Sequence, residues 1–561
     1  MNRAGTDLLP ARLDRWAVER ADRKALIFLG DGETETDSLT FAALHSAAFG
    51  VADLLRPLDA VGRPVLVLPR SGLDFAVALL GCLYAGAIAV PCSSGPRNRG
   101  WERIAAIAAD CGPVAAIGTD EVAELLSAVE ALGIPAVRKT AWTDVGRRPL
   151  PDYSADAPAL LQYTSGSTGS PKGVIVTNRN LASNLQMLKT SFGVHDQSVY
   201  LTWLPLFHDM GLIGNLLAAI YCGVPCVLMQ PLSFYQRPRR WLTAVSRFGA
   251  TISGGPNFAY ELLVRRSDRL DLTGIDLSGW DLAFCGAEIV RASTMRRFAE
   301  RFARTGFKVS ALYPCYGLAE ATVFVTGSEP NKGMQIVSVP DGRETVSCGR
   351  AASGGQVIIV DPDTAMELPE GQTGEIWVSG DHVAQGYWNK PDLTKPTFAA
   401  QLDPGGEGHF LRTGDLGWIS QGELYFAGRL KDLIVWRGTN FHPEDIEATA
   451  ANSDPNFTSI SAAFSIDAGN EEQVVLVQEL VRPVPASFDA REAMASVTSA
   501  VVNAHGLALY DVVLVRAGAL PRTTSGKVQR RHCRELYCER GFGETIHETL
   551  RRLYGTAAEP S

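Results

Sequence analysis

The sequence lacks the cysteine spacings of a zinc site or a disulfide scaffold. Its ten cysteines are scattered singly along 561 residues, and none forms a CxxC pair or a zinc-like spacing with histidine. A chain this long does not need the cross-links that hold small secreted domains together. We therefore expect buried, inert thiols in a reducing compartment. Examples are Cys82, Cys92, Cys111, Cys285 and Cys348.

A surplus of positive charge is also lacking. The net charge is −9 and the isoelectric point about 5.6. Such a chain has no excess of cations to neutralise phosphates, which argues against general binding of nucleic acid or anionic membranes. The first 24 residues are rich in charge and contain no apolar core, so they do not read as a secretory signal. We expect a cytoplasmic protein.

Hydrophobic runs of membrane-spanning length are scarce. Residues 75–92 (FAVALLGCLYAGAIAVPC) come nearest to that length. The run contains Gly81 and Gly86, changes to the β-prone IAV, and stops at Pro91. This pattern predicts a buried helix followed by a buried strand, and no membrane span.

The length of the chain and its texture predict at least two α/β domains. Short apolar runs, such as VLVL (65–68) and CVLM (226–229), alternate with helix-like segments, such as residues 41–55 and 101–110. This alternation is typical of an α/β protein with covered sheets. From about residue 345, strands separated by Gly, Pro and Asp indicate a β-rich subdomain. We expect a boundary near Leu430, dividing the chain into domains 1–430 and 431–561.

The strongest local feature is LLQYTSGSTGSPKGVIVT, residues 161–177. One predicted strand enters a loop rich in Thr, Ser and Gly, and a second strand leaves it. Glycines let the backbone approach phosphate oxygens, while hydroxyls, backbone N–H groups and a lysine bind them. The spacing and the following strand exclude a Walker loop. A plain Ser/Gly hairpin is the alternative. The candidate phosphate-binding residues are Thr164, Ser165, Gly166, Ser167, Thr168, Gly169 and Lys172.

This loop resembles the phosphate loop of the adenylate-forming superfamily, and further motifs in the same order extend the resemblance over almost the whole chain. CGAEIV (285–290) resembles the segment that lines the adenine, which implies roles for Gly286, Ala287 and Glu288. YPCYGLAEAT (313–322) resembles the motif in which an aromatic residue stacks on the base and a glutamate holds Mg²⁺. The residues implied there are Tyr316, Gly317 and Glu320.

The C-terminal part of the chain carries the remaining motifs. In RTGDLG (412–417) the resemblance places Asp415 on the ribose hydroxyls, and in residues 425–447 it places Arg429 on the ribose. It also makes Lys431 the hinge and, in LPRTTSGKVQRR (520–531), Lys527 the catalytic lysine. The family fold implied is a large N-terminal region, with two α/β sheets and a β-rich subdomain, followed by a small, mobile α+β C-terminal domain.

The implied chemistry is attack of a carboxylate on the α-phosphate of ATP, which brings two anions together. Mg²⁺ held by Glu320, with help from Thr164, would neutralise the phosphates. Lys527 would stabilise charge between the acyl carboxylate and the α-phosphate. ATP and Mg²⁺ are therefore the expected cofactors.

The residues after Phe207 indicate the class of acid. Relatives that activate amino acids usually carry an Asp directly after this Phe, whereas here His208 follows, in a pattern resembling acyl ligases. His208 would then lie by the acyl carboxylate. A capping or core histidine is the alternative. The apolar surroundings favour a fatty or otherwise apolar acid.

Within the superfamily the closest resemblance is to fatty acyl-AMP ligases, which pass the acyl group to a carrier protein in lipid, polyketide or lipopeptide biosynthesis. The segments that carry it are HDMGLIG, PLSFYQRPRRWL (231–242) and SGGPNFAYEL (253–262). Fatty acyl-AMP ligases usually carry an insertion after the glutamate motif, and this chain departs from that pattern. Here only 28 positions separate Glu320 from Cys348, so transfer to free CoA stays open.

Two further alternatives concern partners and activity. The basic runs 237–240 and 530–534 fit either contact with an acidic carrier protein or ordinary solvated helix faces. A ligase-like protein that binds ATP or acyl groups without turnover is the non-enzyme alternative, and the intact set of Glu320, Asp415, Arg429 and Lys527 argues against it.

Overall fold

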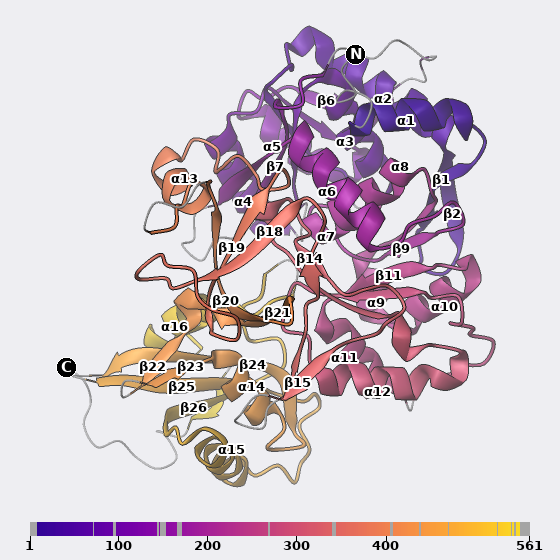
Figure 1. Cartoon of the computed structure of the whole chain (residues 1–561). Coiled ribbons are helices and arrows are strands. Elements are labelled where there is room, and N and C mark those ends of the chain that lie inside the picture. Colours follow the sequence, from indigo (N-terminus) through magenta and orange to yellow (C-terminus); the bar gives the residue numbers. More distant parts are fainter. Residues whose placement is uncertain are drawn as a thin grey trace. The chain divides into compact units, whose positions relative to one another are not determined.

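Two large parallel sheets form the first part of the chain in the computed structural model (Figure 1). The structure describes residues 8–70, 72–93, 97–142, 145, 153–164, 171–267, 270–338, 344–403, 408–436, 439–468, 471–523, 526–539, 541–542 and 546–549. The chain divides into two compact units. The first comprises Met1–Thr413 and Gly417–Phe426, and the second Gly414–Leu416 and Ala427–Ser561.

The larger sheet has nine strands in the order β17-β14-β13-β12-β11-β9-β10-β1-β2. Its centre, from β13 to β1, is parallel, and the strands at both edges are antiparallel. The central strands are short and fully buried, as expected for a sheet covered on both faces. The bounds are β1 (Lys24–Leu29), β2 (Glu35–Thr40), β9 (Tyr200–Thr202), β10 (Cys226–Met229), β11 (Ile252–Gly255), β12 (Leu282–Cys285), β13 (Leu312–Tyr316), β14 (Thr326–Gly327) and β17 (Arg350–Ala351).

The second sheet has six strands in the order β6-β5-β3-β4-β7-β8. It is parallel except for its last pair, β7 and β8, which form an antiparallel hairpin. Helix α3 (Leu73–Ala85) leads into β4 (Ile88–Pro91), which confirms the prediction of a buried helix followed by a buried strand. The other strands are β3 (Pro64–Val67), β5 (Ala115–Gly118), β6 (Ala136–Arg138), β7 (Pro158–Thr164) and β8 (Lys172–Thr177).

Amphipathic helices pack on these sheets. Thr40 caps α2 by accepting a hydrogen bond from the Ala43 N–H, and Thr177 and Asn180 form a reciprocal capping box at the start of α6. The helices are α1 (Leu9–Glu19), α2 (Phe41–Leu55), α4 (Arg97–Cys111), α5 (Ala123–Glu130), α6 (Asn178–Ser191), α7 (Asp209–Gly211), α8 (Ala218–Cys222), α9 (Pro231–Gln236), α10 (Arg239–Phe248), α11 (Asn257–Arg266) and α12 (Ala292–Phe302).

The predicted β-rich region is a four-stranded sheet of β18 (Gly355–Val360), β19 (Gly374–Gly380), β20 (Leu411–Ser420) and β21 (Glu423–Arg429). Helix α13 (Pro391–Phe398) follows β19. The shortened stretch after Glu320 forms β14 and a small hairpin, whose strands are β15 (Ile336–Ser338) and β16 (Glu344–Val346).

The second unit has a four-stranded mixed sheet with its own core. Helix α15 (Ala490–His505) connects the parallel strands β25 and β26, and Met494 and Val497 on this helix are buried with Leu476 and Leu514 of the sheet. The α/β class and this large-plus-small organisation confirm the predicted fold. The remaining elements are β22 (Ile434–Trp436), β23 (Thr439–Phe441), β24 (Phe457–Ala468), β25 (Glu471–Leu480), β26 (Leu509–Val515), β27 (Ile546–Thr549), α14 (Pro443–Ala451) and α16 (Arg530–Cys538).

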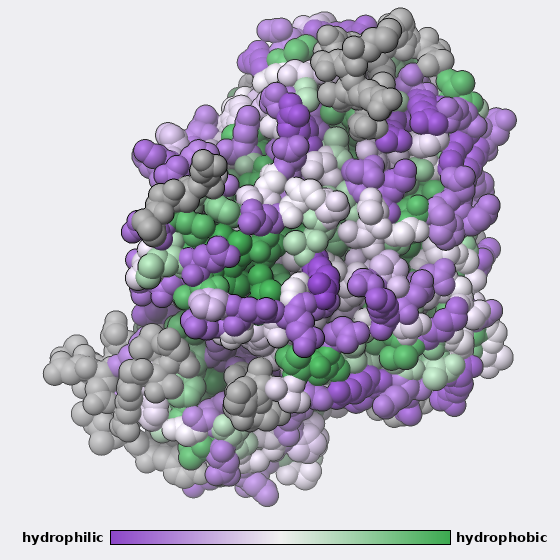
Figure 2. All heavy atoms as spheres, in the orientation of Figure 1, coloured by the Kyte–Doolittle hydropathy of each residue, from purple (hydrophilic) through white to green (hydrophobic). Residues whose placement is uncertain are grey.

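Among the helices that the structure describes, none is long and apolar enough to cross a membrane. Figure 2 shows hydrophilic residues over most of one face, with hydrophobic ones gathered mainly over β18 and β19. Eight of the ten cysteines are buried, and burial raises the pKa of thiols such as Cys82 and Cys285 well above the usual value. These thiols are therefore inert, as the sequence predicted.

His382 is buried in the first unit with neither ring nitrogen hydrogen-bonded to another described residue. Burial lowers its pKa to about 4, against a small opposing effect of Asp381. The folded protein thus keeps this ring neutral at a pH where the unfolded chain, with a histidine pKa near ~6.5, takes up a proton. The stability contributed by neutral His382 is present above pH ~6.5 and is lost as the pH falls toward ~4.

We predict that acidification from pH 7 to pH 5 costs the wild type about 2 kcal/mol more of unfolding free energy than it costs His382→Phe. Urea unfolding followed by tryptophan fluorescence measures the unfolding free energy of the first unit. Nine of the ten tryptophans lie in that unit, and only Trp436 lies in the second. His195→Gln, at an exposed histidine, should keep the wild-type pH dependence. If the unfolding free energies of wild type and His382→Phe depended equally on pH, the lowered pKa assigned to His382 would be contradicted.

Candidate active site

The predicted phosphate loop joins β7 to β8 at the end of the six-stranded sheet. Thr164, the last residue of β7, is paired in register with Lys172, the first residue of β8. The hairpin therefore brings these two predicted residues together. Five others lie outside the described residues, namely Ser165, Gly166, Ser167, Thr168 and Gly169.

The strand that leads into the loop is fixed by charged neighbours. The hydroxyl of Tyr163 donates to the Asp110 carboxylate at 2.6 Å, and Arg103 donates to the Tyr163 carbonyl at 3.4 Å. Lys390 pairs with the other oxygen of Asp110. Tyr163 directly precedes Thr164, so helix α4 holds the entrance of the loop in place.

Residues 385–388 extend the sheet beyond β8. The Gln385 N–H donates to the Ile175 carbonyl at 3.0 Å, the Ile175 N–H to the Gly386 carbonyl at 2.9 Å, and the Trp388 N–H to the Gly173 carbonyl at 2.8 Å. Through this pairing, the ring of Tyr387 lies 5.3 Å from the Lys172 ammonium, in cation–π contact.

The same segment brings Glu320 to the loop. Glu320 lies in a short 3₁₀ turn, and its carbonyl accepts a hydrogen bond from the Ala384 N–H at 2.9 Å. The Tyr387 hydroxyl donates to Glu320 Oε1 at 2.9 Å. Burial and the nearby carboxylate raise the pKa of Tyr387 well above its usual value, so the hydroxyl stays a donor. Tyr387 is a site residue that the sequence analysis missed, since nothing in QGYWNK (385–390) signals phosphate chemistry.

The segments expected to line the adenine follow two neighbouring parallel strands, β12 and β13. A Cβ on Gly286 would lie 2.8 Å from the Cys315 carbonyl oxygen, and one on Gly317 would lie 1.7 Å from that of Val323. Ala287 has a left-handed φ of 69°. Both predicted segments therefore stand at the carboxyl edge of the sheet, where α/β proteins bind ligands.

Two residues of these segments make contacts of their own. Tyr316 is buried, and its ring stacks with Phe426 at a centroid distance of 6.0 Å. Glu288 accepts a hydrogen bond from the Phe258 N–H at 2.5 Å, which ties this segment to the start of α11.

His208 stands at the start of α7, where the capping alternative is observed. It caps this short helix, since Nδ1 accepts from the Met210 N–H at 3.4 Å and lies 2.5 Å from an Asp209 oxygen. The ring is still partly exposed. Gln162 of β7 donates to the Phe207 carbonyl at 2.7 Å, which couples this turn to the phosphate-loop strand.

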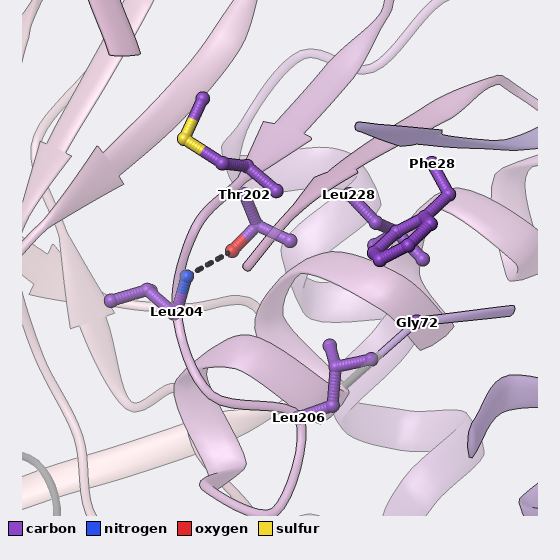
Figure 3. Close-up of a pocket in the computed structure, with 7 residues that line it drawn as sticks. Phe28, Gly72, Thr202, Leu204, Leu206 and Leu228 are labelled. Atoms are coloured by element: carbon purple, nitrogen blue, oxygen red, sulfur yellow. Dashed lines mark hydrogen bonds between the residues drawn. The ribbon is translucent and has the colours of Figure 1, made fainter. Parts of the chain in front are cut away.

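An apolar pocket lies at the carboxyl ends of β9 and β10 (Figure 3). Some of its lining residues lie shortly before His208 in the chain. In the close-up, Phe28, Leu228 and Leu206 border a common space, and the Leu204 N–H is bonded to the Thr202 hydroxyl at 3.1 Å. Every lining side chain except Thr202 is apolar. The lining residues are Phe28, Gly72, Thr202, Leu204, Leu206, Leu228 and Met229.

The other predicted site residues belong to the second unit. Asp415, with 6% of its side chain exposed, forms an ion pair with Arg429 at 3.2 Å, and both residues belong to that unit. Lys431 lies in the 3₁₀ turn Leu430–Asp432. Lys527 closes a turn in which its carbonyl accepts from the Thr523 N–H at 2.7 Å.

No group of three His, Cys, Asp or Glu side chains with metal-binding geometry occurs in the described part of the chain. A carboxylate oxygen of Glu320 and the hydroxyl of Thr164 nevertheless fit a hard cation such as Mg²⁺, which is usually bound by one or two protein oxygens together with substrate phosphates. The residues present are thus compatible with Mg²⁺ carried by a nucleotide.

Comparison with known proteins identifies the family. The chain matches the model "AMP-binding enzyme" over residues 13–388 and "Disco-interacting protein 2-like, AMP domain" over residues 431–545. It is 39% identical to the medium-chain-fatty-acid–[acyl-carrier-protein] ligase JamA of Moorena producens, over 92% of this chain and 93% of the relative. It is 38% identical to the long-chain-fatty-acid–AMP ligase FadD26 of Mycobacterium marinum, over 95% and 98%. A putative fatty-acid–CoA ligase of Mycobacterium tuberculosis, fadD25, is 37% identical over 95% and 98%.

Solved structures agree with the sequence relatives. The fatty acyl-adenylate ligase of Legionella pneumophila, in complex with acyl adenylate and pyrophosphate, has a TM-score of 0.73 at 34% identity, covering 97% of both chains. A structure from a study of fatty acyl-adenylate ligases of E. coli and L. pneumophila has a TM-score of 0.84 at 28% identity, covering 96% of this chain and 99% of that one. The chain therefore belongs to the AMP-binding, adenylate-forming enzyme superfamily and is similar to its fatty acyl-AMP ligases.

Proposed function

We propose that this ligase uses ATP to convert a fatty or other apolar carboxylic acid into acyl-AMP and pyrophosphate, and then passes the acyl group to a carrier protein. The observation that carries the proposal is the link from Lys172 through Tyr387 to Glu320, which assembles a cation, a hydroxyl donor and a carboxylate beside the phosphate loop. ATP use follows from the family.

Residues at the phosphate end of the site would bind the negatively charged phosphates of ATP. Lys172 and the loop's N–H and hydroxyl groups would bind the β- and γ-phosphates. Glu320 and Thr164 would hold Mg²⁺, which supplies charge neutralisation and orients pyrophosphate as leaving group. Tyr387 fixes the carboxylate of Glu320 and so limits its reorganisation during the reaction.

The nucleoside end uses the two glycine-bearing segments and the second unit. Gly286, Ala287, Glu288 and Gly317 would line the adenine, with Tyr316 stacking on it. Asp415 would accept hydrogen bonds from the ribose hydroxyls while Arg429, its ion-pair partner, contacts the same sugar. The pairing keeps the buried carboxylate compensated before the nucleotide binds.

The acid is proposed to lie with its carboxylate near His208 and its tail toward the apolar pocket at β9 and β10. Leu204 and Leu206, which lie four and two residues before His208 in the chain, line that pocket. Each buried CH₂ of the tail would contribute about 0.8 kcal/mol to binding. An apolar tail therefore suits this site better than a charged amino acid.

Lys527 would stabilise the charge that develops between the acyl carboxylate and the α-phosphate. A lysine suits this role as a compact charge on a long stem. Lys431, in the turn at the start of the second unit, would be the hinge about which that unit reorients between the two half-reactions.

The acceptor is proposed to be the phosphopantetheine thiol of a carrier protein, and the enzyme to act in the cytoplasm, where ATP is available. Two relatives are named for carrier-protein or AMP ligation, while another is named a putative CoA ligase. The short stretch between Glu320 and Cys348 keeps free CoA as the second candidate acceptor.

Lys527→Ala is predicted to lower acid-dependent ATP–pyrophosphate exchange by about 10²–10³-fold or more, because it removes charge stabilisation in the transition state. Nucleotide binding, followed by calorimetry, should largely survive. Lys332→Ala, at an exposed lysine that pairs with Glu329, is the control and should exchange normally. Retained exchange in Lys527→Ala would refute its role, and no exchange by the parent with any acid would favour a binding protein.

Tyr387→Phe is predicted to raise the Mg²⁺ concentration needed for half-maximal exchange by about 10-fold, because Glu320 loses the donor that orients it. Tyr153→Phe is a matched control, since it removes a hydroxyl that donates to the Tyr84 carbonyl. Titration of exchange rate against Mg²⁺ makes the measurement. An unchanged titration would show that Tyr387 does not act through the ion.

The acceptor is tested by incubating the enzyme with ATP, Mg²⁺ and fatty acids of graded length, then adding either CoA or a holo carrier protein. We expect acyl-AMP to accumulate with apolar acids, rapid acylation of the carrier, and slow acyl-CoA formation. Mass spectrometry of the products distinguishes these outcomes. Rapid acyl-CoA formation would overturn the carrier assignment while leaving adenylation intact.

A further inference from the structure

The largest concentration of buried charge in the described part of the second unit surrounds Arg530. The Arg530 side chain is only 18% exposed, and its Nε and Nη2 donate to the two oxygens of Glu447 at 2.6 and 2.8 Å. Nη1 contacts Glu444 at 2.7 Å and Asp432 at 3.3 Å. All three guanidinium nitrogens are thus engaged by carboxylates.

This arrangement is specific to arginine. A planar fork matches the bidentate carboxylate of Glu447 and leaves Nη1 for the other two acids, a geometry that a lysine ammonium does not reproduce. Burial lowers the pKa of Arg530, but the carboxylates of Glu447, Glu444 and Asp432 outweigh it and raise that pKa well above its usual value. Arg530, the first residue of the basic run 530–534, is therefore not part of a solvated helix face.

The cluster joins segments that are far apart in the sequence. Asp432 ends the 3₁₀ turn that contains Lys431, and Glu444 and Glu447 lie on α14. Glu447 also accepts a hydrogen bond from the Ala463 N–H of β24 at 3.0 Å. Arg530 begins α16, three residues after Lys527.

The turn that carries Lys527 is fixed at its other end by a second buried acid. Glu479, with 2% of its side chain exposed, pairs with Arg522 at 2.7 Å and accepts from the Leu520 N–H at 3.1 Å. Within the turn, the Lys527 N–H donates to the Thr523 hydroxyl at 3.1 Å, and Arg522 pairs with Val528 across it. Ion pairs therefore hold the chain on both sides of Lys527.

Stability alone is a weak explanation for such a cluster. Desolvating one guanidinium and three carboxylates is costly, and buried ion pairs are often no more stabilising than apolar residues of similar size. What the cluster does fix is relative position. Arg530 contacts both Asp432 of the 430–432 turn and the helix α14, so these segments are tied to the start of α16, three residues after Lys527.

We propose that Arg530, with Glu447, Glu444 and Asp432, is a positioning cluster that sets the Lys527 turn at a fixed place relative to the hinge residue Lys431. This proposal rests on the proposed roles of Lys527 and Lys431. Any reorientation of the second unit is then confined to Lys431 and the residues before it, and carries Lys527 to the same place in every cycle.

The test compares Arg530→Gln, Arg530→Lys and the matched control Arg531→Gln in ATP–pyrophosphate exchange. Arg531 is the next residue on α16, is 58% exposed and, among the described residues, forms an ion pair only with Glu535. We expect Arg530→Gln to lower kcat about 10- to 100-fold with KM for ATP and acid changed less than about 3-fold, because a misplaced catalytic group costs rate and leaves ground-state binding intact. Arg530→Lys should recover part of kcat, and Arg531→Gln should match the parent.

A double-mutant cycle separates positioning from general damage. If Arg530 acts through Lys527, then Arg530→Gln adds less than about 2-fold to the loss already present in Lys527→Ala. Multiplicative losses in the double variant, or wild-type kcat in Arg530→Gln, would overturn the proposal. An unaffected Lys527→Ala would instead refute the proposed role of Lys527, and no exchange by the parent would refute the proposed function, so the failures are distinguishable.

A milder variant keeps the test decisive if Arg530→Gln does not fold. Asp432→Asn leaves the bidentate contact with Glu447 intact and weakens only the 3.3 Å contact between the cluster and the hinge turn. Its kcat should fall, with melting temperature close to that of the parent and with the same non-additivity toward Lys527→Ala. A wild-type kcat in this variant would overturn the link to the hinge.

Discussion

The pairing of residues 385–388 with strand β8 is the constraint on which the phosphate end of the site depends. It places Tyr387 between the Lys172 ammonium and the Glu320 carboxylate, which come from segments about 150 residues apart in the chain. Backbone hydrogen bonds, which form whatever the side chains are, thus set the positions of the Lys172 and Glu320 side chains, whose interactions depend strongly on distance.

Three buried carboxylates of the second unit are likewise held by specific contacts, each with an arginine. Asp415 is buried against Arg429, Glu479 against Arg522, and Glu447 against Arg530. A buried carboxylate without a cation would be costly, so each acid has an arginine within ion-pair distance. These pairs lie close in sequence to the second-unit segments for which ribose-binding, hinge and catalytic roles are proposed.

Much of the fold was predictable because its elements carry local signals. Hydrophobic periodicity, interrupted by Gly and Pro, predicts the apolar strands β3, β8 and β10. It also predicts the helix and strand at residues 75–92 and the helix at residues 41–55. The site was predictable only where motif order resembled a known superfamily. Tyr387, Gln162 and the anchoring pair of Asp110 and Tyr163 gave no such signal, because their contacts join residues between 45 and 67 positions apart.

The sequence by itself indicated the chemistry by resemblance: the order of the phosphate loop, the glutamate motif and the two C-terminal lysine segments indicated adenylate formation, and His208 after Phe207 indicated an acyl substrate. Tertiary structure alone decided which groups support those residues. It showed that His208 caps a helix as well as facing solvent, that Arg530 is buried, and that Glu320 receives the Tyr387 hydroxyl. The physical reason is that motifs record short-range spacing, whereas hydrogen bonds and ion pairs depend on distances set by packing of elements remote in the chain.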